Sequence, residues 1–337
     1  MLIARAPMRL SLAGGGTDIP AFYDAHGGMV VSMAIDKYVY VFISANGHDS
    51  LHISSSDFST FFRHSGDGEV AEDGKLRYAR AFVREFGIRS GYSVFMASEM
   101  PPGTGLGSSS ALAVALAKGL SALKGRMPDK GAVAEMAAGV EMDRLRMPIG
   151  KQDHYAAAFG GLNAIHFSAG GVRVEPLEVA AETRQWLERS VLIFFTEQAH
   201  ESREILAEQT RRSSNEDPET IRALEAIKGH AEEARLALIE GRPDDLGDIL
   251  DRTWQMKRRV APGISNERID DAYRCAREAG ASGGKIAGAG GGGFLLLLCP
   301  EGTQAAVTAA MDAKGLSRAD FHVEYAGARV LVNNGAA

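Results

Sequence analysis

Residues 101–111 read Pro-Pro-Gly-Thr-Gly-Leu-Gly-Ser-Ser-Ser-Ala, and the Ala- and Leu-rich segment Ser109–Leu123 continues from them. The preceding segment, Tyr92–Met100, has the Val, Tyr and Phe content of a strand, whereas the composition of Ser109–Leu123 favours a helix. A glycine-rich turn between a strand and a helix gathers backbone N–H groups and the positive end of the helix dipole in one small space. The stretch therefore predicts an anion-binding loop, and phosphate is the ligand that suits it best.

A glycine cluster taken alone is more often a turn than a ligand site, because glycine is the usual residue at positive φ. In this loop, however, glycine lets the backbone approach a phosphate, and three serine hydroxyls can donate to it or ligate Mg²⁺. The loop is not a Walker A motif, because no lysine follows in a Gly-Lys-Ser/Thr ending. The predicted phosphate-binding residues are Pro102, Gly103, Thr104, Gly105, Leu106, Gly107, Ser108, Ser109 and Ser110.

The composition is that of an ordinary globular protein, with 337 residues, 45% hydrophobic side chains and 24% charged ones. This length allows one large or two medium domains. The formal charge of −6 argues against a nucleic-acid partner, since proteins that bind phosphate backbones concentrate basic charge. Cys275 and Cys299 are too few for a disulfide framework, which favours the reducing cytoplasm.

We expect neither export nor a membrane partner. Arg5 and Arg9 interrupt the apolar stretch that a signal peptide needs. The most apolar run, Phe294–Cys299, is far shorter than the ~20 residues that span a bilayer, so it predicts a buried strand. The short basic runs Arg211-Arg212 and Lys257-Arg258-Arg259 are typical of solvated faces.

The order of the elements indicates an α+β protein. Strands and helices alternate in the first half, residues from Glu201 to about Ala279 are mostly helical, and strands return at the end. The composition changes near residues 168–190, so we expect an N-terminal domain at 1–175 and a C-terminal domain at 176–337. The predicted strands are Leu2–Leu12, Met29–Ser44, Tyr92–Met100, Val191–Phe195, Lys285–Leu298 and Phe321–Val332, and the predicted helices outside the mostly helical region are Arg77–Phe86, Ser109–Leu123, Asp129–Arg146 and Thr303–Ala313.

Three glycine-rich segments occur along the chain, at Ala13–Asp18, Pro101–Ser110 and Gly288–Gly293. The third contains Gly288-x-Gly290-x-x-Gly293, the spacing of a dinucleotide-binding fingerprint. Such a loop must leave a strand and enter a helix, whereas these glycines run into the apolar segment Phe294–Leu298. We therefore do not expect NAD binding. The segment is either a simple strand connection or a backbone that closes over a ligand without side-chain bulk.

Two carboxylates form the next candidate site. Glu141 comes late in a predicted helix, and Asp153 follows beyond a break at Met147-Pro148 that can fold the two together. One carboxylate on Mg²⁺ and another facing a substrate hydroxyl is the arrangement that phosphoryl transfer requires, although the spacing alone also fits two solvated carboxylates. The neighbouring Lys151 is a hypothetical partner that would hold Asp153 ionised.

Together, these segments resemble the GHMP kinase family over nearly the whole chain and in the family's order. Residues 101–111 are similar to the family's ATP phosphate loop, Ala6–Asp18 to its first motif and Lys285–Phe294 to its third. The resemblance implies a ribosomal protein S5 domain 2-like N-terminal domain and a ferredoxin-like C-terminal domain, with the active site between them. The segments Ala13–Asp18, His26–Val41 and Gly150–Asn163 are most similar to the bacterial D-glycero-D-manno-heptose 7-phosphate 1-kinases, which serve the synthesis of surface polysaccharides such as capsule or lipopolysaccharide.

The resemblance also implies ATP and Mg²⁺ as cofactors and assigns roles to single residues. Ser109 and Glu141 would hold Mg²⁺, Asp153 would be the base, and Arg9 would stabilise the transferring phosphoryl group. In the substrate site, the implied residues are Gly15, Gly16, Thr17, Asp18, Gly290 and Gly291. Where the resemblance leads us to expect a Thr-Gly turn after Val191–Phe195, this chain has Thr-Glu-Gln-Ala-His at 196–200.

The expected partner is a small-molecule sugar phosphate, and the chain is compatible with a homodimer. A sugar phosphate needs local basic groups, and the candidates near the expected sugar site are Lys37, His200 and Arg203. Two alternatives stay open at this point. One is a kinase of an unphosphorylated sugar, as in galactokinase or fucokinase, and the other is a ligand sensor that kept the fold without catalysis.

Overall fold

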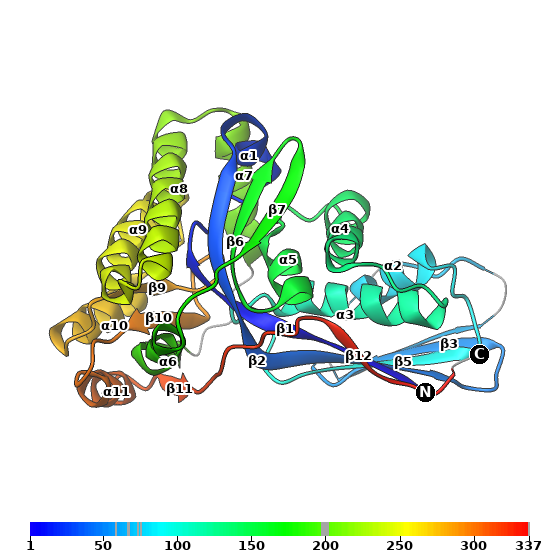
Figure 1. Cartoon of the computed structure of the whole chain (residues 1–337). Coiled ribbons are helices and arrows are strands. Elements are labelled where there is room, and N and C mark those ends of the chain that lie inside the picture. The colour runs from blue at the N-terminus through cyan, green and yellow to red at the C-terminus, as the bar shows by residue number, and fades with distance from the viewer. Residues whose placement is uncertain (58, 66–67, 73, 75, 197–201, 336–337) are drawn as a thin grey trace.

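In the computed structural model, which describes residues 1–57, 59–65, 68–72, 74, 76–196 and 202–335, the chain forms two β-sheets flanked by helices (Figure 1). The strands are β1 (Leu2–Ala13), β2 (Gly28–Ala45), β3 (Ser50–Ser55), β4 (Thr60–Ser65), β5 (Tyr92–Ser98), β6 (Leu162–Ser168), β7 (Gly171–Pro176), β8 (Val191–Phe195), β9 (Gly283–Ile286), β10 (Phe294–Leu298), β11 (Ser317–Ala319) and β12 (Arg329–Asn333). The α-helices are α1 (Pro20–His26), α2 (Arg77–Glu85), α3 (Ser108–Leu123), α4 (Lys130–Gly139), α5 (Gln152–Phe159), α6 (Ala181–Ser190), α7 (Ser202–Ser214), α8 (Pro218–Ile239), α9 (Leu246–Val260), α10 (Glu267–Glu278) and α11 (Gln304–Ala313).

The larger, eight-stranded sheet has the order β12-β1-β2-β5-β3-β4, and β6 with β7 extends it beside the first half of β2. Helix α3 packs on β1 and β2. Its small side chains allow this close approach: a Cβ on Gly119 would lie 3.2 Å from the Cβ of Ala4. Because α3 is apolar on nearly all sides, it is stable only as a buried helix, which fixes the glycine-rich loop at its N-terminus against the sheet.

The smaller sheet has the order β11-β8-β10-β9, and all of its pairs are antiparallel. Numbered along the chain, these strands follow the order 4-1-3-2, the arrangement of a ferredoxin-like sheet. The expected α+β fold with a ferredoxin-like C-terminal domain is therefore confirmed. Strand β10 is fully buried, as its apolar sequence predicts.

The end of the chain returns to the larger sheet, where β12 pairs with β1 (Figure 1). A strand was expected over Phe321–Val332, but it covers Arg329–Asn333, and residues 320–328 form the crossing between the sheets. Within this crossing, only Val323 forms a single bridge, to Ile35 of β2. The segment 176–337 thus contributes one strand to the N-terminal sheet.

None of the helices in the described ranges is both long enough and apolar enough to cross a membrane.

Candidate active site

A cavity of about 700 Å³ lies where the larger sheet, the glycine-rich loop and the C-terminal helices meet. Its wall contains Arg9 of β1, Asp18 of the following loop and Asp153 of α5. Helices α7 and α9 add Arg203 and Lys257 from the other half of the chain. The cavity thus joins the glycine-rich loop, Asp18 and Asp153 with Arg203, a predicted phosphate ligand, and with Lys257, which the sequence assigned to a solvated face.

The glycine-rich loop connects β5 to α3, as predicted. Gly103, Gly105 and Gly107 have φ angles of +77°, +79° and +75°, a conformation that side chains other than glycine rarely adopt. The N-terminus of α3 has no side-chain cap among the described residues, so its first N–H groups are available to an anion. Ser108, Ser109 and Ser110 line the cavity beside them.

Two residues of the predicted loop turn away from the cavity. Thr104 and Leu106 are both fully buried. The hydroxyl of Thr104 donates to the carbonyl of Pro101 at 3.1 Å, and the carbonyl of Leu106 accepts from the N–H of Arg9 at 3.0 Å. These two residues hold the loop in place, and the loop glycines and serines line the cavity.

The third glycine-rich segment packs directly against this loop. A Cβ on Gly105 would lie 2.4 Å from the carbonyl oxygen of Ala287, and a Cβ on Gly288 would lie 2.7 Å from the Cα of Gly105. Gly288 lines the cavity, whereas the N–H of Gly291 donates to the carbonyl of Ile264 at 2.8 Å and a Cβ on Gly290 would lie 2.7 Å from the same carbonyl oxygen. The segment is thus both a strand connection and part of the site wall.

Arg9 and Asp153 form a two-pronged ion pair. Nε and Nη2 of Arg9 each donate to one oxygen of Asp153 at 2.7 Å, and Nη1 donates to the carbonyl of Gly105 at 2.6 Å. Arg9 is 3% exposed, and a Cβ on Gly107 would lie 3.1 Å from the Asp153 carboxylate. A fixed guanidinium and a fixed carboxylate therefore lie beside the glycine-rich loop.

Asp18 is a second carboxylate in the wall, and unlike Asp153 it is buried. It accepts from the N–H groups of Gly16 at 3.0 Å and Gln152 at 3.2 Å. Burial, followed by the charge of Asp153, raises the pKa of Asp18. The segment before α5 fits around it, since a Cβ on Gly150 would lie 1.9 Å from an Asp18 oxygen. These contacts make Asp18 a rigid polar group at the cavity surface.

Gly15 and Thr17 have a structural place near Asp18. The hydroxyl of Thr17 donates to the carbonyls of Gly14 and Met29, and the residue is fully buried. A Cβ on Gly15 would contact the side chain of Ser11. Of the glycines in this turn, Gly16 is the one that reaches the cavity.

Lys151 does not pair with Asp153, so the proposed sequence-neighbour contact is wrong. Its ammonium donates to both oxygens of Glu135, at 3.0 and 2.7 Å. Lys151 caps α5 while Asp153 lies in its first turn, and side chains two positions apart on a helix point to different sides. The partner of Asp153 is instead Arg9.

Glu141 lies in a π-helical turn, Val140–Arg144, and is fully buried. One of its oxygens lies 2.5 Å from Nε2 of the equally buried His154, and the other has no hydrogen-bond partner among the described residues. Burial and the charge of Glu141 raise the pKa of Tyr78 to about 12. An unsatisfied buried carboxylate oxygen is a donor atom that suits a divalent cation.

On the opposite wall, α7 presents Arg203, Leu206 and Gln209 at intervals of three residues. Gln209 donates to the carbonyl of Gly16 at 2.8 Å, so α7 is tied to the N-terminal domain. Lys37 lies outside this cavity, in the middle of β2 beside Asp36, whose N–H bonds to His322. His200 lies outside the described residues.

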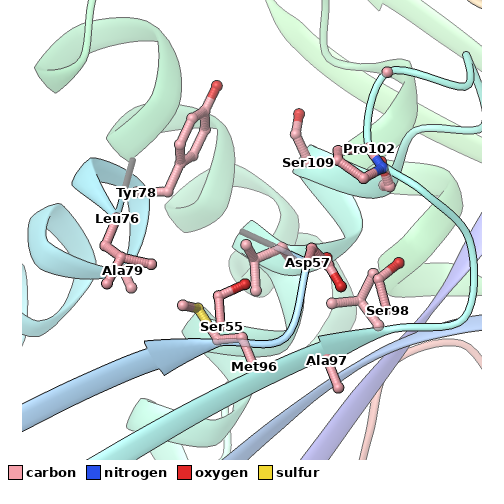
Figure 2. A pocket seen from close by; sticks show the side chains of 14 residues that line it. Ser55, Asp57, Leu76, Tyr78, Ala79, Met96, Ala97, Ser98, Pro102 and Ser109 are labelled. Atoms are coloured by element: carbon pink, nitrogen blue, oxygen red, sulfur yellow. The ribbon is translucent and has the colours of Figure 1, made fainter. Parts of the chain in front are cut away.

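A second, smaller pocket of about 110 Å³ opens beside the loop (Figure 2). Tyr78 and Leu76 line one side, Met96 lies on β5 below, and Pro102 and Ser109 close the loop side. Ser109 borders both cavities. Apart from Pro102, Gly103 and the loop serines, the sequence did not single out the residues of this pocket, because they belong to ordinary amphipathic elements.

The prediction of a solvated side chain is wrong for Lys257. The run Lys257-Arg258-Arg259 was expected to be a solvated face, and Arg258 and Arg259 are indeed exposed. Lys257 is 6% exposed and faces the cavity. Successive positions on a helix differ by about 100° in direction, so one run of charge can divide between solvent and a site.

Comparison with known proteins agrees with this architecture. The model of the GHMP kinases N terminal domain matches residues 75–161, and that of the GHMP kinases C terminal domain matches residues 234–316. The chain is 30% identical to the D-glycero-alpha-D-manno-heptose 7-phosphate kinase of Campylobacter jejuni over 297 residues, 86% of this chain and 87% of that one.

Two further relatives extend the comparison. The crystal structure of a D-glycero-D-manno-heptose 1-phosphate kinase from Bacteroides thetaiotaomicron superimposes with a TM-score of 0.81 at 25% identity, covering 99% of this chain and 100% of that one. The bifunctional fucokinase/GDP-fucose pyrophosphorylase of Arabidopsis thaliana is 26% identical over 318 residues, which are 89% of this chain and 30% of that protein.

Proposed function

We propose that this chain, which belongs to the GHMP kinase family, transfers the γ-phosphate of ATP to the anomeric hydroxyl of D-glycero-D-manno-heptose 7-phosphate. The product would be the 1,7-bisphosphate, an intermediate for surface polysaccharide. The observation that carries the proposal is the Arg9–Asp153 pair, held within contact of the phosphate-binding loop at Gly107. The names of the two heptose kinases above supply the sugar.

In the transfer, Asp153 accepts the proton of the sugar hydroxyl while that oxygen attacks the γ-phosphorus. The bond between the γ-phosphorus and the bridging oxygen breaks, and ADP leaves with the electron pair. Arg9 orients the Asp153 carboxylate, and each carboxylate oxygen keeps a lone pair that can accept the proton. The guanidinium of Arg9 also faces the charge that develops on the phosphoryl group. Arg9 and Asp153 thus act by positioning and electrostatics rather than by covalent catalysis.

The nucleotide would extend from the α3 N-terminus into the smaller pocket. There, Leu76 and Met96 offer an apolar slot for the flat base, and Ser109 links the slot to the phosphate site. Ser109 and the unsatisfied oxygen of Glu141 are the groups that would hold Mg²⁺. When bound, Mg²⁺ neutralises charge on the phosphates.

The sugar would occupy the other end of the larger cavity, between Asp18 and α7. Asp18 is held by backbone N–H groups and would accept hydrogen bonds from sugar hydroxyls. Arg203 is the basic group of α7 at this wall, so we place the 7-phosphate beside it. An unphosphorylated sugar would leave Arg203 without a partner.

The Arg203→Ala variant should raise the KM for heptose 7-phosphate strongly and leave the KM for ATP almost unchanged. The expected loss is roughly 1.5–3 kcal/mol of charge-assisted hydrogen bonding. Arg211→Ala on the same helix is the matched control, because Arg211 pairs with Glu208 and is exposed. Steady-state kinetics with heptose 7-phosphate and with unphosphorylated heptose measure the effect. Equal effects on the two sugars would exclude Arg203 as the phosphate ligand.

The proposed function is tested with a panel of acceptors under identical conditions. ADP release is measured with heptose 7-phosphate, unphosphorylated heptose, galactose, fucose and mevalonate, and phosphorus NMR locates the new phosphate on the product. We expect the highest kcat/KM with heptose 7-phosphate and a phosphate on the anomeric carbon. Preference for galactose or fucose would identify a kinase of unphosphorylated sugars, and no transfer to any acceptor would favour a ligand sensor.

A further inference from the structure

Lys257 is a buried cation in the wall of the site, and the transfer described above does not use it. It lies in the last turn of α9 and lines the cavity together with Arg9 and Asp153. Its ammonium donates a hydrogen bond to the carbonyl of Gly288. Because this partner is a neutral carbonyl and not a carboxylate, the hydrogen bond does not neutralise the charge of the ammonium.

The carbonyl that holds Lys257 lies next to the phosphate-binding loop. A Cβ on Gly288 would lie 2.7 Å from the Cα of Gly105, and the carbonyl of Gly105 accepts from Arg9 at 2.6 Å. Two touching loops therefore each hold one cation by a backbone carbonyl. Both cations face the cavity in which the terminal phosphate of ATP would lie.

The charged groups around Lys257 come from several elements. Arg9 on β1 is a cation in its neighbourhood, while Asp18 and Asp153 are the carboxylates. Burial, followed by the charge of Arg9, lowers the pKa of Lys257 to about 8, and the two carboxylates act in the opposite direction. Part of the Lys257 population is therefore neutral in the empty site near pH 8, and an arriving anion would favour its protonation.

A second buried lysine, Lys285 on β9, lies near Lys257 and Arg9. Burial and the charges of Lys257 and Arg9 lower the pKa of Lys285 well below its usual value. Helix α8 also packs on α9, where its His230 faces Thr253, one turn before Lys257. Lys285 and His230 are thus two further groups on these elements that could take up a proton.

We propose that Lys257 is a second cation on the transferring phosphoryl group, released from the carbonyl of Gly288 when ATP binds. The fraction of Lys257 that is neutral takes up a proton from the buffer, the ammonium donates to the terminal phosphate, and the same proton returns to the buffer once the phosphoryl group has left on the sugar. Apart from this N–H bond, no covalent bond changes at Lys257. The inference rests on the proposed function, because that function places the terminal phosphate of ATP beside Gly105.

Proton uptake on nucleotide binding tests this inference without any sugar. Calorimetric titrations with ATP and with ADP are run at pH 7 and pH 9 in buffers of different ionisation enthalpy. Because the pKa of Lys257 is lowered to about 8, more of it is neutral at pH 9 than at pH 7, so ATP should bind with a clearly larger proton uptake at pH 9 than at pH 7. ADP lacks the γ-phosphate and should bind without this proton uptake.

Variants then test whether Lys257 takes up the proton and whether it contacts the terminal phosphate of ATP. Lys257→Met should abolish the proton uptake, weaken the binding of ATP at least tenfold more than the binding of ADP, and lower kcat by about 10²-fold. Lys257→Arg should keep tight ATP binding. Lys285→Met should retain the uptake. Lys228→Met is the matched control, because Lys228 also donates to a backbone carbonyl, that of His26 at 2.7 Å, outside the cavity.

The outcomes separate this inference from the proposed function. If Lys257→Met weakens ATP and ADP equally, or keeps the proton uptake, Lys257 only supports the Gly288 loop and the inference is wrong. If Lys257→Met does not fold, retention of the uptake at pH 9 by Lys257→Arg would overturn the inference, since an arginine stays charged there. Transfer by the wild type to none of the sugars would reject the proposed function, while the ATP and ADP titrations would still decide the role of Lys257.

Discussion

Asp153→Asn should lower kcat by about 10²- to 10⁴-fold, the range that a general base contributes. The carboxamide is close in size to the carboxylate, but it cannot accept the hydroxyl proton. It also presents an N–H₂ group to Arg9, which now donates to both oxygens of Asp153. ATP affinity should change little, because the loop glycines and the α3 N-terminus are untouched. Turnover is measured with saturating sugar and ATP, and affinity by calorimetry.

The control for this variant is Asp24→Asn, the same change at an exposed position on α1. It should leave both kcat and ATP affinity at the wild-type level. Turnover of Asp153→Asn within threefold of the wild type would remove Asp153 from the role of base. A loss of ATP affinity as large as the loss of kcat would instead assign the residue to nucleotide binding.

Gly105→Ala should destabilise the protein by roughly 2–5 kcal/mol and reduce ATP affinity with it. The residue has a φ of +79°, which an alanine adopts at a cost. Its Cβ would also lie 2.4 Å from the carbonyl oxygen of Ala287, so the phosphate-binding loop and the third glycine-rich segment would have to separate. Valine would clash in the same place, with the additional bulk of its branches. Thermal and denaturant unfolding measure the loss.

Gly87→Ala isolates the part of this effect that comes from backbone conformation. Gly87 has a φ of +64°, and a Cβ there would meet nothing within 4 Å. Its substitution should therefore cost about 1–2 kcal/mol for the left-handed conformation and leave ATP affinity unchanged. Equal destabilisation by the two substitutions would show that the contact between the loops carries no stability.

Local patterns predicted much of the fold. The apolar, β-rich segments near the N-terminus became β1 and β2, and the Ala- and Leu-rich segment became α3. The strands β3, β4, β6 and β7 were not predicted. Their sequences are more polar, or their apolar patterns are shorter. Strands β4 and β7 also lie at edges of the sheet, with one face exposed to solvent. These strands are therefore stabilised by pairing with their neighbours rather than by their own composition.

The partner of Asp153 shows where local reasoning fails. Lys151 is two residues away and faces Glu135, whereas Arg9 is 144 residues away and makes the ion pair. Helix α5 decides this outcome, because it turns the two neighbouring side chains to different sides. Sequence distance carries no information about such a contact.

The sequence by itself predicted the glycine-rich loop between a strand and a helix, the α+β class and the family, because glycine content, helix-forming composition and motif order can be read along the chain. Only the tertiary structure brought Arg9 to Asp153, left one oxygen of Glu141 unsatisfied and turned Lys257 inward from a basic run. The physical reason is that a side chain's charge, partner and exposure depend on which surfaces pack around it. Those surfaces come from segments that are distant along the chain.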